Sequence, residues 1–166
     1  MNSIIQSTLK TLQKSEHLLV NLEDTVFSNV SVSPYYSSIG SHMRHILDFY
    51  DCILNRENGD IIDLTDRKRN KSVETCGEQA LCYLKDIVAK LKILDKRIDD
   101  TVMVKDDLGM GTVEMPYTYA ALLAQANSHT IHHYAIINYI LDRLGIVFSD
   151  SDFGYNPTTP KATNLN

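Results

Sequence analysis

Apolar residues recur every three or four positions in several stretches of the chain, which is the period of an amphipathic α-helix. The pattern predicts four helices, at about residues 3–24, 34–56, 75–97 and 116–144. Amphipathic helices of about 20 residues bury their apolar faces by packing together as a bundle. The connections between them are long enough to allow an order other than simple up-down-up-down.

Capping signals mark several of these helix ends. Ser33 followed by Pro34 is a typical helix start, with serine as the N-cap and proline at the first helical position. Thr75 with Glu78 three residues later predicts a capping box at the start of the third helix. Gly145 is expected to end the fourth.

The segments outside the helices differ in character. Residues 98–104 and 112–115 are short β-branched stretches around a glycine-containing turn, and they predict a small β-hairpin between the third and fourth helices. Residues 58–72 form a long polar connection, a type of loop that usually serves a site or is mobile. Residues 149–166 are predicted to be a surface or disordered tail. The fold prediction is therefore an all-α four-helix bundle over residues 1–148, with one small hairpin.

Composition narrows the class of protein. A chain of 166 residues with 43% hydrophobic and 22% charged residues is typical of one globular domain. A formal charge of −5 and a pI near 5.6 argue against nucleic acid as a partner, and the short basic run at 67–71 is interpreted as a solvated loop. No apolar run approaches the ~20 residues needed to cross a membrane. Three cysteines without a pairing pattern indicate reduced thiols and a cytoplasmic location.

Histidines carry the candidate chemistry. Five of the six fall in two helical segments, at His42, His45, His129, His132 and His133. His129 and His133 lie one turn apart in an apolar stripe of the fourth helix, a spacing at which two imidazoles can bind one metal ion. His132 points about 60° to the side of His129. Because burying two imidazoles without partners is costly, a shared metal ion is the favoured interpretation.

The second helix offers the third ligand. His42 and His45 both lie on the flank of its apolar arc, and helix geometry alone slightly favours His42. The pair on the fourth helix is not a zinc-peptidase motif, because Thr130 follows His129 where that motif requires glutamate. The spacing therefore predicts a metal site without the peptidase chemistry of that motif.

Two segments resemble motifs of the DinB-like superfamily of helical-bundle proteins. Residues 38–48, Ser-Ile-Gly-Ser-His-Met-Arg-His-Ile-Leu-Asp, resemble its second-helix motif, and residues 128–134, Ser-His-Thr-Ile-His-His-Tyr, resemble its fourth-helix motif. Residues 152–158 are similar to the C-terminal end of one uncharacterised branch. The order of helices, the long second loop and the late hairpin agree as well, so the resemblance covers most of the chain.

The resemblance implies a four-helix bundle with a long crossover loop that dimerises and holds a divalent metal ion. Matched by motif, the ligands would be His45, His129 and His133. Characterised relatives include metal-dependent thiol transferases, a mycothiol-dependent isomerase and a domain of sulfoxide synthases. Many relatives follow the last histidine with Arg-Gly-Gln, whereas this chain has Tyr-Ala-Ile at 134–136, so their substrate chemistry does not carry over directly.

Three neutral ligands would leave a divalent ion its full charge and an open position. A water there is acidified toward a pKa of ~7 on zinc, and a thiol there is held as thiolate. Zinc or nickel is favoured and iron is allowed. We therefore expect a thiol S-transferase or a hydrolase that acts on a small molecule, such as a low-molecular-weight thiol. The alternatives are a non-catalytic stress-response or binding protein with a structural metal, and a helical dimerisation module without metal.

The residues of a catalytic acid or base are not evident from the sequence. Asp48 could orient a ligand, but pairing with Arg44 one turn away is the favoured interpretation. Cys52 is interpreted as buried filler rather than a nucleophile. The same structural interpretation is favoured for three helical tyrosines, namely Tyr50, Tyr134 and Tyr139.

Overall fold

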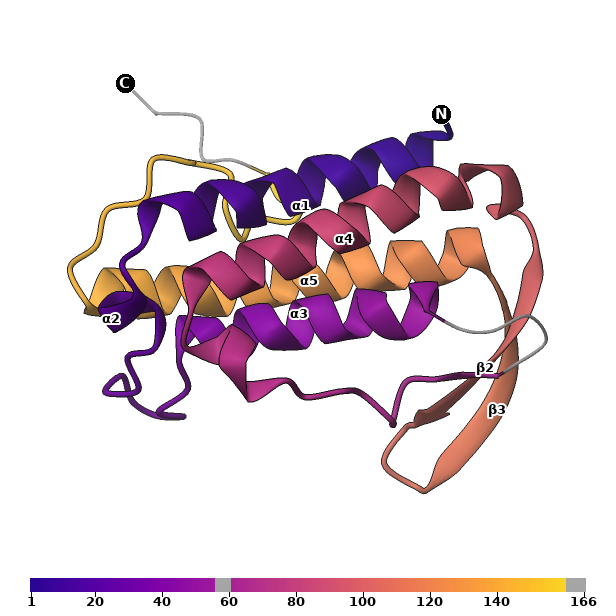
Figure 1. Ribbon diagram of the computed structural model, residues 1–166, viewed down its shortest axis with the longest axis horizontal. Coiled ribbons are helices and arrows are strands. Elements are labelled where there is room, and N and C mark those ends of the chain that lie inside the picture. Colours follow the sequence, from indigo (N-terminus) through magenta and orange to yellow (C-terminus); the bar gives the residue numbers. More distant parts are fainter. Residues whose placement is uncertain (56–60, 161–166) are drawn as a thin grey trace.

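The computed structural model describes residues 1–55 and 61–160 (Figure 1). Its α-helices are α1 (Ser3–Asn21), α2 (Asp24–Phe27), α3 (Ile39–Leu54), α4 (Gly77–Leu94) and α5 (Tyr119–Arg143). Two short 3-10 helices are η1 (Lys71–Glu74) and η2 (Asp95–Arg97). The strands are β1 (Ile62–Asp63), β2 (Thr101–Asp107) and β3 (Thr112–Thr118).

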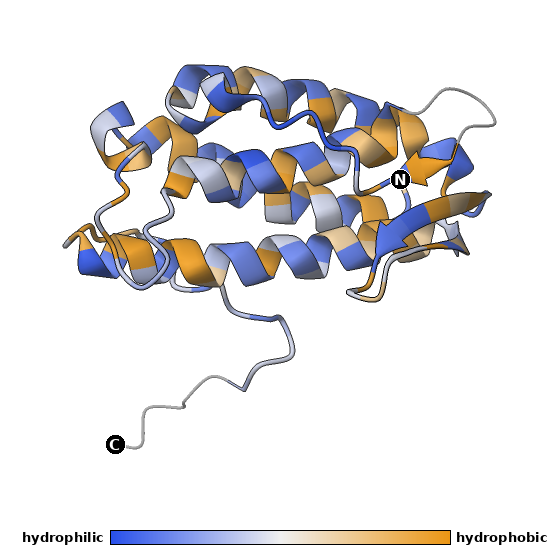
Figure 2. Ribbon diagram, turned by 90° about the horizontal axis from the view of Figure 1, so that it is seen from below, coloured by the Kyte–Doolittle hydropathy of each residue, from blue (hydrophilic) through white to orange (hydrophobic). Residues whose placement is uncertain are grey.

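The four long helices lie side by side around one apolar core (Figure 1). α1 and α3 each pack against both α4 and α5. Bands of hydrophobic and hydrophilic residues alternate along these helices, as expected when each buries one face (Figure 2). On α1, for example, Ile5, Leu12 and Leu19 recur at two-turn intervals and are buried. Each such side chain contributes about 1.5–3 kcal/mol by leaving water.

The all-α prediction is wrong, because the described residues also form a mixed three-stranded sheet in the order β1-β2-β3. β2 and β3 are antiparallel, which confirms the predicted hairpin. β1 pairs parallel to β2 and lies within the stretch expected to be a polar loop, of which residues 58–60 lie outside the described part. A strand of two residues is too short to show an alternating pattern. Ile62 and Leu64 nevertheless anchor it, being 1% and 3% exposed.

A fifth α-helix was also not predicted. α2 is a single turn directly after α1, and it buries Phe27 against the core. Its first residue has a long-range role, because Asp24 Oδ1 accepts a hydrogen bond of 2.8 Å from the backbone N–H of Gly77. That carboxylate caps α4, so the predicted capping box at Thr75 is not formed and the helix begins two residues later.

Two other helices begin later than predicted. α3 begins at Ile39 rather than at Pro34, with the Ser38 hydroxyl accepting from the N–H of Ser41 at 2.9 Å. α5 begins at Tyr119, because residues 112–118 pair in the hairpin instead of extending the helix. Both helices end close to where the periodicity ends.

The segment between β1 and α4 runs along α3 (Figure 1). It approaches closely at Gly40, where a Cβ atom would lie 1.9 Å from the carbonyl oxygen of Glu74. Arg44 of α3 also donates to the Glu74 carboxylate at 2.7 Å. A glycine in the first turn of α3 is therefore required for η1 to dock on that helix.

The C-terminal segment returns over α5. Phe153 is 1% exposed and stacks on Tyr134, with ring centroids 4.5 Å apart. Gly154, with φ +81°, passes so close that a Cβ atom would lie 2.7 Å from the Cα of Ala135. Residues 161–166 of the predicted tail lie outside the described part. No helix among the described residues is long and apolar enough to cross a membrane.

Candidate metal centre

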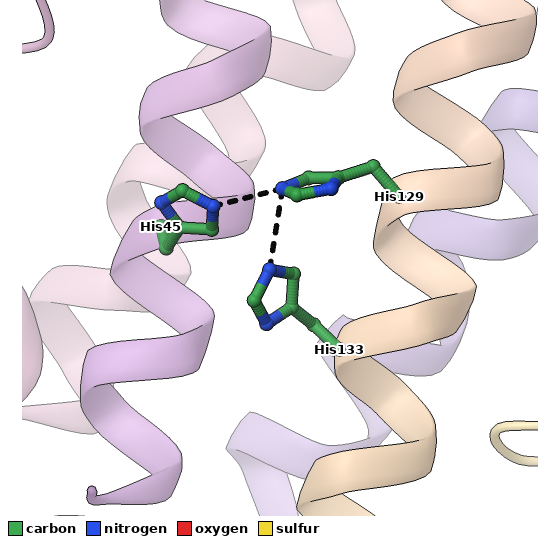
Figure 3. A group of neighbouring side chains, drawn as sticks. All are labelled: His45, His129 and His133. Atoms are coloured by element: carbon green, nitrogen blue, oxygen red, sulfur yellow. Dashed lines mark hydrogen bonds between the residues drawn. The ribbon is translucent and has the colours of Figure 1, made fainter. Parts of the chain in front are cut away.

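Three histidines converge between α3 and α5. His45 projects from α3, and His129 and His133 project from successive turns of α5, with their rings turned toward one another (Figure 3). The two α5 rings share a helix face because they are four residues apart. His45 reaches them because α3 packs directly against α5.

The distances between ring nitrogens are close to those of a metal site. Nε2 of His129 lies 2.8 Å from Nε2 of His45 and 3.2 Å from Nε2 of His133 (Figure 3). One ligand atom from each residue falls within 4.8 Å of the other two. In a tetrahedral site, each ligating nitrogen lies about 2.0–2.1 Å from the ion, so two such nitrogens lie about 3.4 Å apart. Small side-chain adjustments would therefore accommodate an ion. The three histidines therefore lie close enough to hold a metal ion.

Hydrogen bonding within the triad also favours a cation. An sp² ring nitrogen carries either one hydrogen or one lone pair, and so takes part in one strong in-plane hydrogen bond. Nε2 of His129 faces two other Nε2 atoms, and hydrogen bonds cannot satisfy both contacts. A cation shared by three lone pairs removes this conflict, so the donor set fits a divalent metal.

The triad lies at the edge of the core. The buried side of α5 carries Ala126, Thr130 and Tyr134, whereas His129 and His133 are only partly buried. The sequence pattern had placed both histidines in the middle of the inward-facing stripe. Both histidines instead lie on the flank of that stripe, at the edge of the core.

The surroundings keep the imidazoles neutral. Burial lowers the pKa of His45 from 6.5 to about 3, with the charge of Arg67 as the next cause. Burial and then the charge of His129 lower the pKa of His133 to about 2. The pKa of His129 is lowered as well, by burial first and then by His132. At neutral pH the triad therefore offers unprotonated nitrogens, as metal binding requires.

His42 contacts the triad from outside. Its Nδ1 lies 2.9 Å from Nδ1 of His133, and its Nε2 lies 2.8 Å from the Ser37 hydroxyl. If Nε2 of His133 binds a metal, its Nδ1 carries hydrogen and donates to His42, which in turn donates to Ser37. All three groups are then satisfied, and such an outer partner is what fixes the orientation of a metal-binding histidine. Helix geometry alone had slightly favoured His42 as the ligand, but the nitrogens that meet at the centre belong to His45, His129 and His133.

Arg67 was missed by the sequence reasoning, which had assigned it to a solvated basic loop. Its Nη1 donates to Nδ1 of His45 at 3.1 Å. The next two residues tie the segment to α3, because Lys68 pairs with Asp51 at 2.9 Å and the N–H of Arg69 donates to Asp48 at 3.2 Å. Basic composition could not reveal this contact, since only the path of the chain along α3 creates it.

The remaining candidates have structural roles, except Tyr139, which is 74% exposed and so does not pack in the core as interpreted. Asp48 pairs with Arg44 at 2.8 Å, which confirms the favoured interpretation, although Asp48 is buried rather than on the surface. Burial raises the pKa of Cys52 to about 11, so its thiol is not activated. Tyr50 and Tyr134 are fully buried, and burial raises the pKa of both.

Comparison of the chain with protein-family models, with curated proteins and with solved structures finds no match.

Proposed function

We propose that this protein is a metal-dependent enzyme in which His45, His129 and His133 hold one divalent ion, and that it belongs to the DinB-like superfamily. Zinc or nickel is the favoured ion and iron is allowed, because imidazole suits all three. The observation that carries the proposal is the meeting of three neutral ring nitrogens from two helices. The proposed substrate is a small molecule, either a thiol for S-transfer or a hydrolysable compound.

Catalysis is favoured over a purely structural metal by the number of ligands. Structural zinc sites are normally closed by four protein ligands, whereas catalytic sites have three and an open position. The triad supplies three, which would leave a tetrahedral ion with one open position. A divalent ion there would act as a Lewis acid that lowers the pKa of a bound water or thiol.

The chain's own residues would prepare the site in three ways. His42 holds the ring of His133 in place through their Nδ1 atoms. Phe49, which is 7% exposed, packs against His129 with ring centroids 5.1 Å apart and shields that ring from water. Burial keeps the ligand nitrogens free of protons at neutral pH.

Metal content tests the proposal directly. The full chain, purified without a histidine tag, is compared with His129→Ala and with His132→Ala by elemental analysis. His132 is a matched control because it lies on the same helix but is exposed and outside the triad. We expect about one ion per chain in the wild type and the control, and less than a tenth of that in His129→Ala. Equal metal content in the wild type and His129→Ala, or none in either, would overturn the proposal.

Catalysis is then tested with the loaded protein. The assays follow the consumption of a low-molecular-weight thiol with an alkylating electrophile, and the hydrolysis of activated esters. Turnover that is lost in His129→Ala and retained in His132→Ala supports an enzyme. Full metal loading that only raises the melting temperature, with no turnover of either substrate class, favours a structural metal instead.

A further inference from the structure

The contact between Arg67 and His45 does not suit a loaded metal site. A guanidinium can only donate, so Nδ1 of His45 must accept in the observed contact, and the ring's hydrogen then lies on Nε2. Nε2 is the atom that faces the triad and would bind the ion. When Nε2 binds an ion, the hydrogen lies on Nδ1. Nδ1 and the N–H of Arg67 are then both donors, and they cannot form a hydrogen bond with each other. Metal loading therefore removes the acceptor that Arg67 uses.

Arg67 has little else to bind within residues 1–55 and 61–160. That contact with His45 is its one hydrogen bond there, and it forms no ion pair there. Its Nε is buried without a partner, which is rare for a charged group. The arginine of α3, Arg44, is by contrast paired with Asp48 and Glu74. Arg67 is thus an unbalanced cation beside the triad.

The fold holds Arg67 in this position from both sides. On the N-terminal side, the N–H of Leu64 donates to the carbonyl of Lys105 at 2.9 Å and the Leu64 side chain is buried. On the C-terminal side, the ion pair between Lys68 and Asp51 ties the segment to α3. These contacts keep Arg67 beside α3, with its guanidinium next to the centre.

The net positive charge of a metal-loaded site would favour the binding of an anion. Three neutral imidazoles leave a divalent ion with its two charges, and Arg67 adds a third. Asp106 on β2 acts on His129 through its charge and offsets this only in part. A guanidinium next to an ion with an open coordination position matches carboxylate and phosphate groups in shape and charge.

We propose that Arg67 binds an anionic oxygen group of the substrate when the triad holds its ion, so that the site selects small molecules with a carboxylate or phosphate close to the atom that reaches the metal. This inference rests on the proposed function and specifies its substrate class. It also assigns a role to the basic segment beside α3. The consequence is coupling, since the ion and the anion each strengthen the binding of the other.

The test uses the full chain loaded with Co²⁺, whose visible absorption changes when a thiol binds. Dissociation constants are measured for mercaptoacetate, which carries a carboxylate, and for 2-mercaptoethanol, which is neutral and of similar size. The protein is compared with Arg67→Gln and with Arg69→Gln. Arg69 is a matched control, because its exposed side chain lies two residues away and only its backbone N–H contacts α3.

We expect Arg67→Gln to reduce the preference for mercaptoacetate over 2-mercaptoethanol by about 10- to 100-fold, because it removes a hydrogen bond between charged groups. Arg69→Gln should retain the preference. Without thiol, Arg67→Gln should bind Co²⁺ as tightly as the wild type or more tightly, because a like charge has been removed. Competition by acetate and by inorganic phosphate, lost in Arg67→Gln, shows which anion the site prefers.

Each remaining outcome decides the matter. If Co²⁺ binds and the preference is unchanged in Arg67→Gln, the role of Arg67 is refuted and the metal site stands. If Arg67→Gln weakens Co²⁺ binding itself, the arginine supports the fold and the inference also fails. If the wild type binds no Co²⁺, the proposed function fails first.

Discussion

Protons and a metal ion compete for the same three nitrogens, and the structure determines how strongly. A histidine with an ordinary pKa of 6.5 is largely protonated at pH 5, which weakens metal binding by a factor of about 30 for each ligand. Three such ligands would weaken it by about 3 × 10⁴-fold between pH 7.5 and pH 5. This is the behaviour of a triad whose rings are in ordinary contact with water.

In this protein the competition should be far weaker. The pKa of His45 is lowered to about 3 and that of His133 to about 2, so both remain unprotonated at pH 5. His129, whose pKa is also lowered from 6.5, can contribute at most one such factor of about 30. We therefore expect zinc affinity to fall by no more than about 30-fold between pH 7.5 and pH 5.

Competition with a chromophoric chelator measures this affinity at each pH, after correction for protonation of the chelator. The variant Arg67→Gln provides an internal check, because removal of a charge that lowers the pKa of His45 should make the dependence slightly steeper. A loss near 3 × 10⁴-fold in the wild type would show that the histidines titrate independently in water. That result would refute the packed triad described above.

Three further predictions concern the stability of the metal-free fold, the role of His42 and the role of Gly40. Without metal, the folded-state pKa values of His45 and His133 lie below the unfolded value of 6.5, so the unfolded chain takes up protons first as the pH falls. The free energy of unfolding should therefore be highest above pH 6.5 and should decrease as the pH falls toward 3; urea titrations that show no such decrease would contradict the shifts. His42→Ala should lower zinc affinity by about 10- to 100-fold by releasing the ring of His133, whereas His132→Ala should leave zinc affinity unchanged. Equal affinities in the two variants would show that His42 does not position His133. Gly40→Ala should destabilise the fold by about 1–3 kcal/mol or more, because the alanine methyl group would overlap the carbonyl of Glu74. An unchanged melting temperature would mean that η1 docks differently.

Local periodicity accounts for what could be predicted from the sequence. A spacing of four residues on a helix places His129 and His133 on one face whatever surrounds the helix. The positions of the four long helices and of the hairpin follow from the same kind of short-range pattern. Helix starts were less accurate, because Asp24 caps α4 from 53 residues away and no local motif signals that contact.

Only the tertiary structure could decide the rest of the fold and the site. The choice between His42 and His45 depends on how α3 is rotated against α5; helix geometry alone slightly favoured His42, and only the resemblance favoured His45. β1 exists because Ile62 and Asp63 pair with a strand more than 40 residues later, and so short a strand has no periodicity of its own. Arg67 reaches His45 because Lys68, Arg69 and Leu64 fasten its segment to other elements. Periodicity is a property of neighbouring residues, whereas the rotation of helices and the path of a loop depend on packing between residues far apart in the chain.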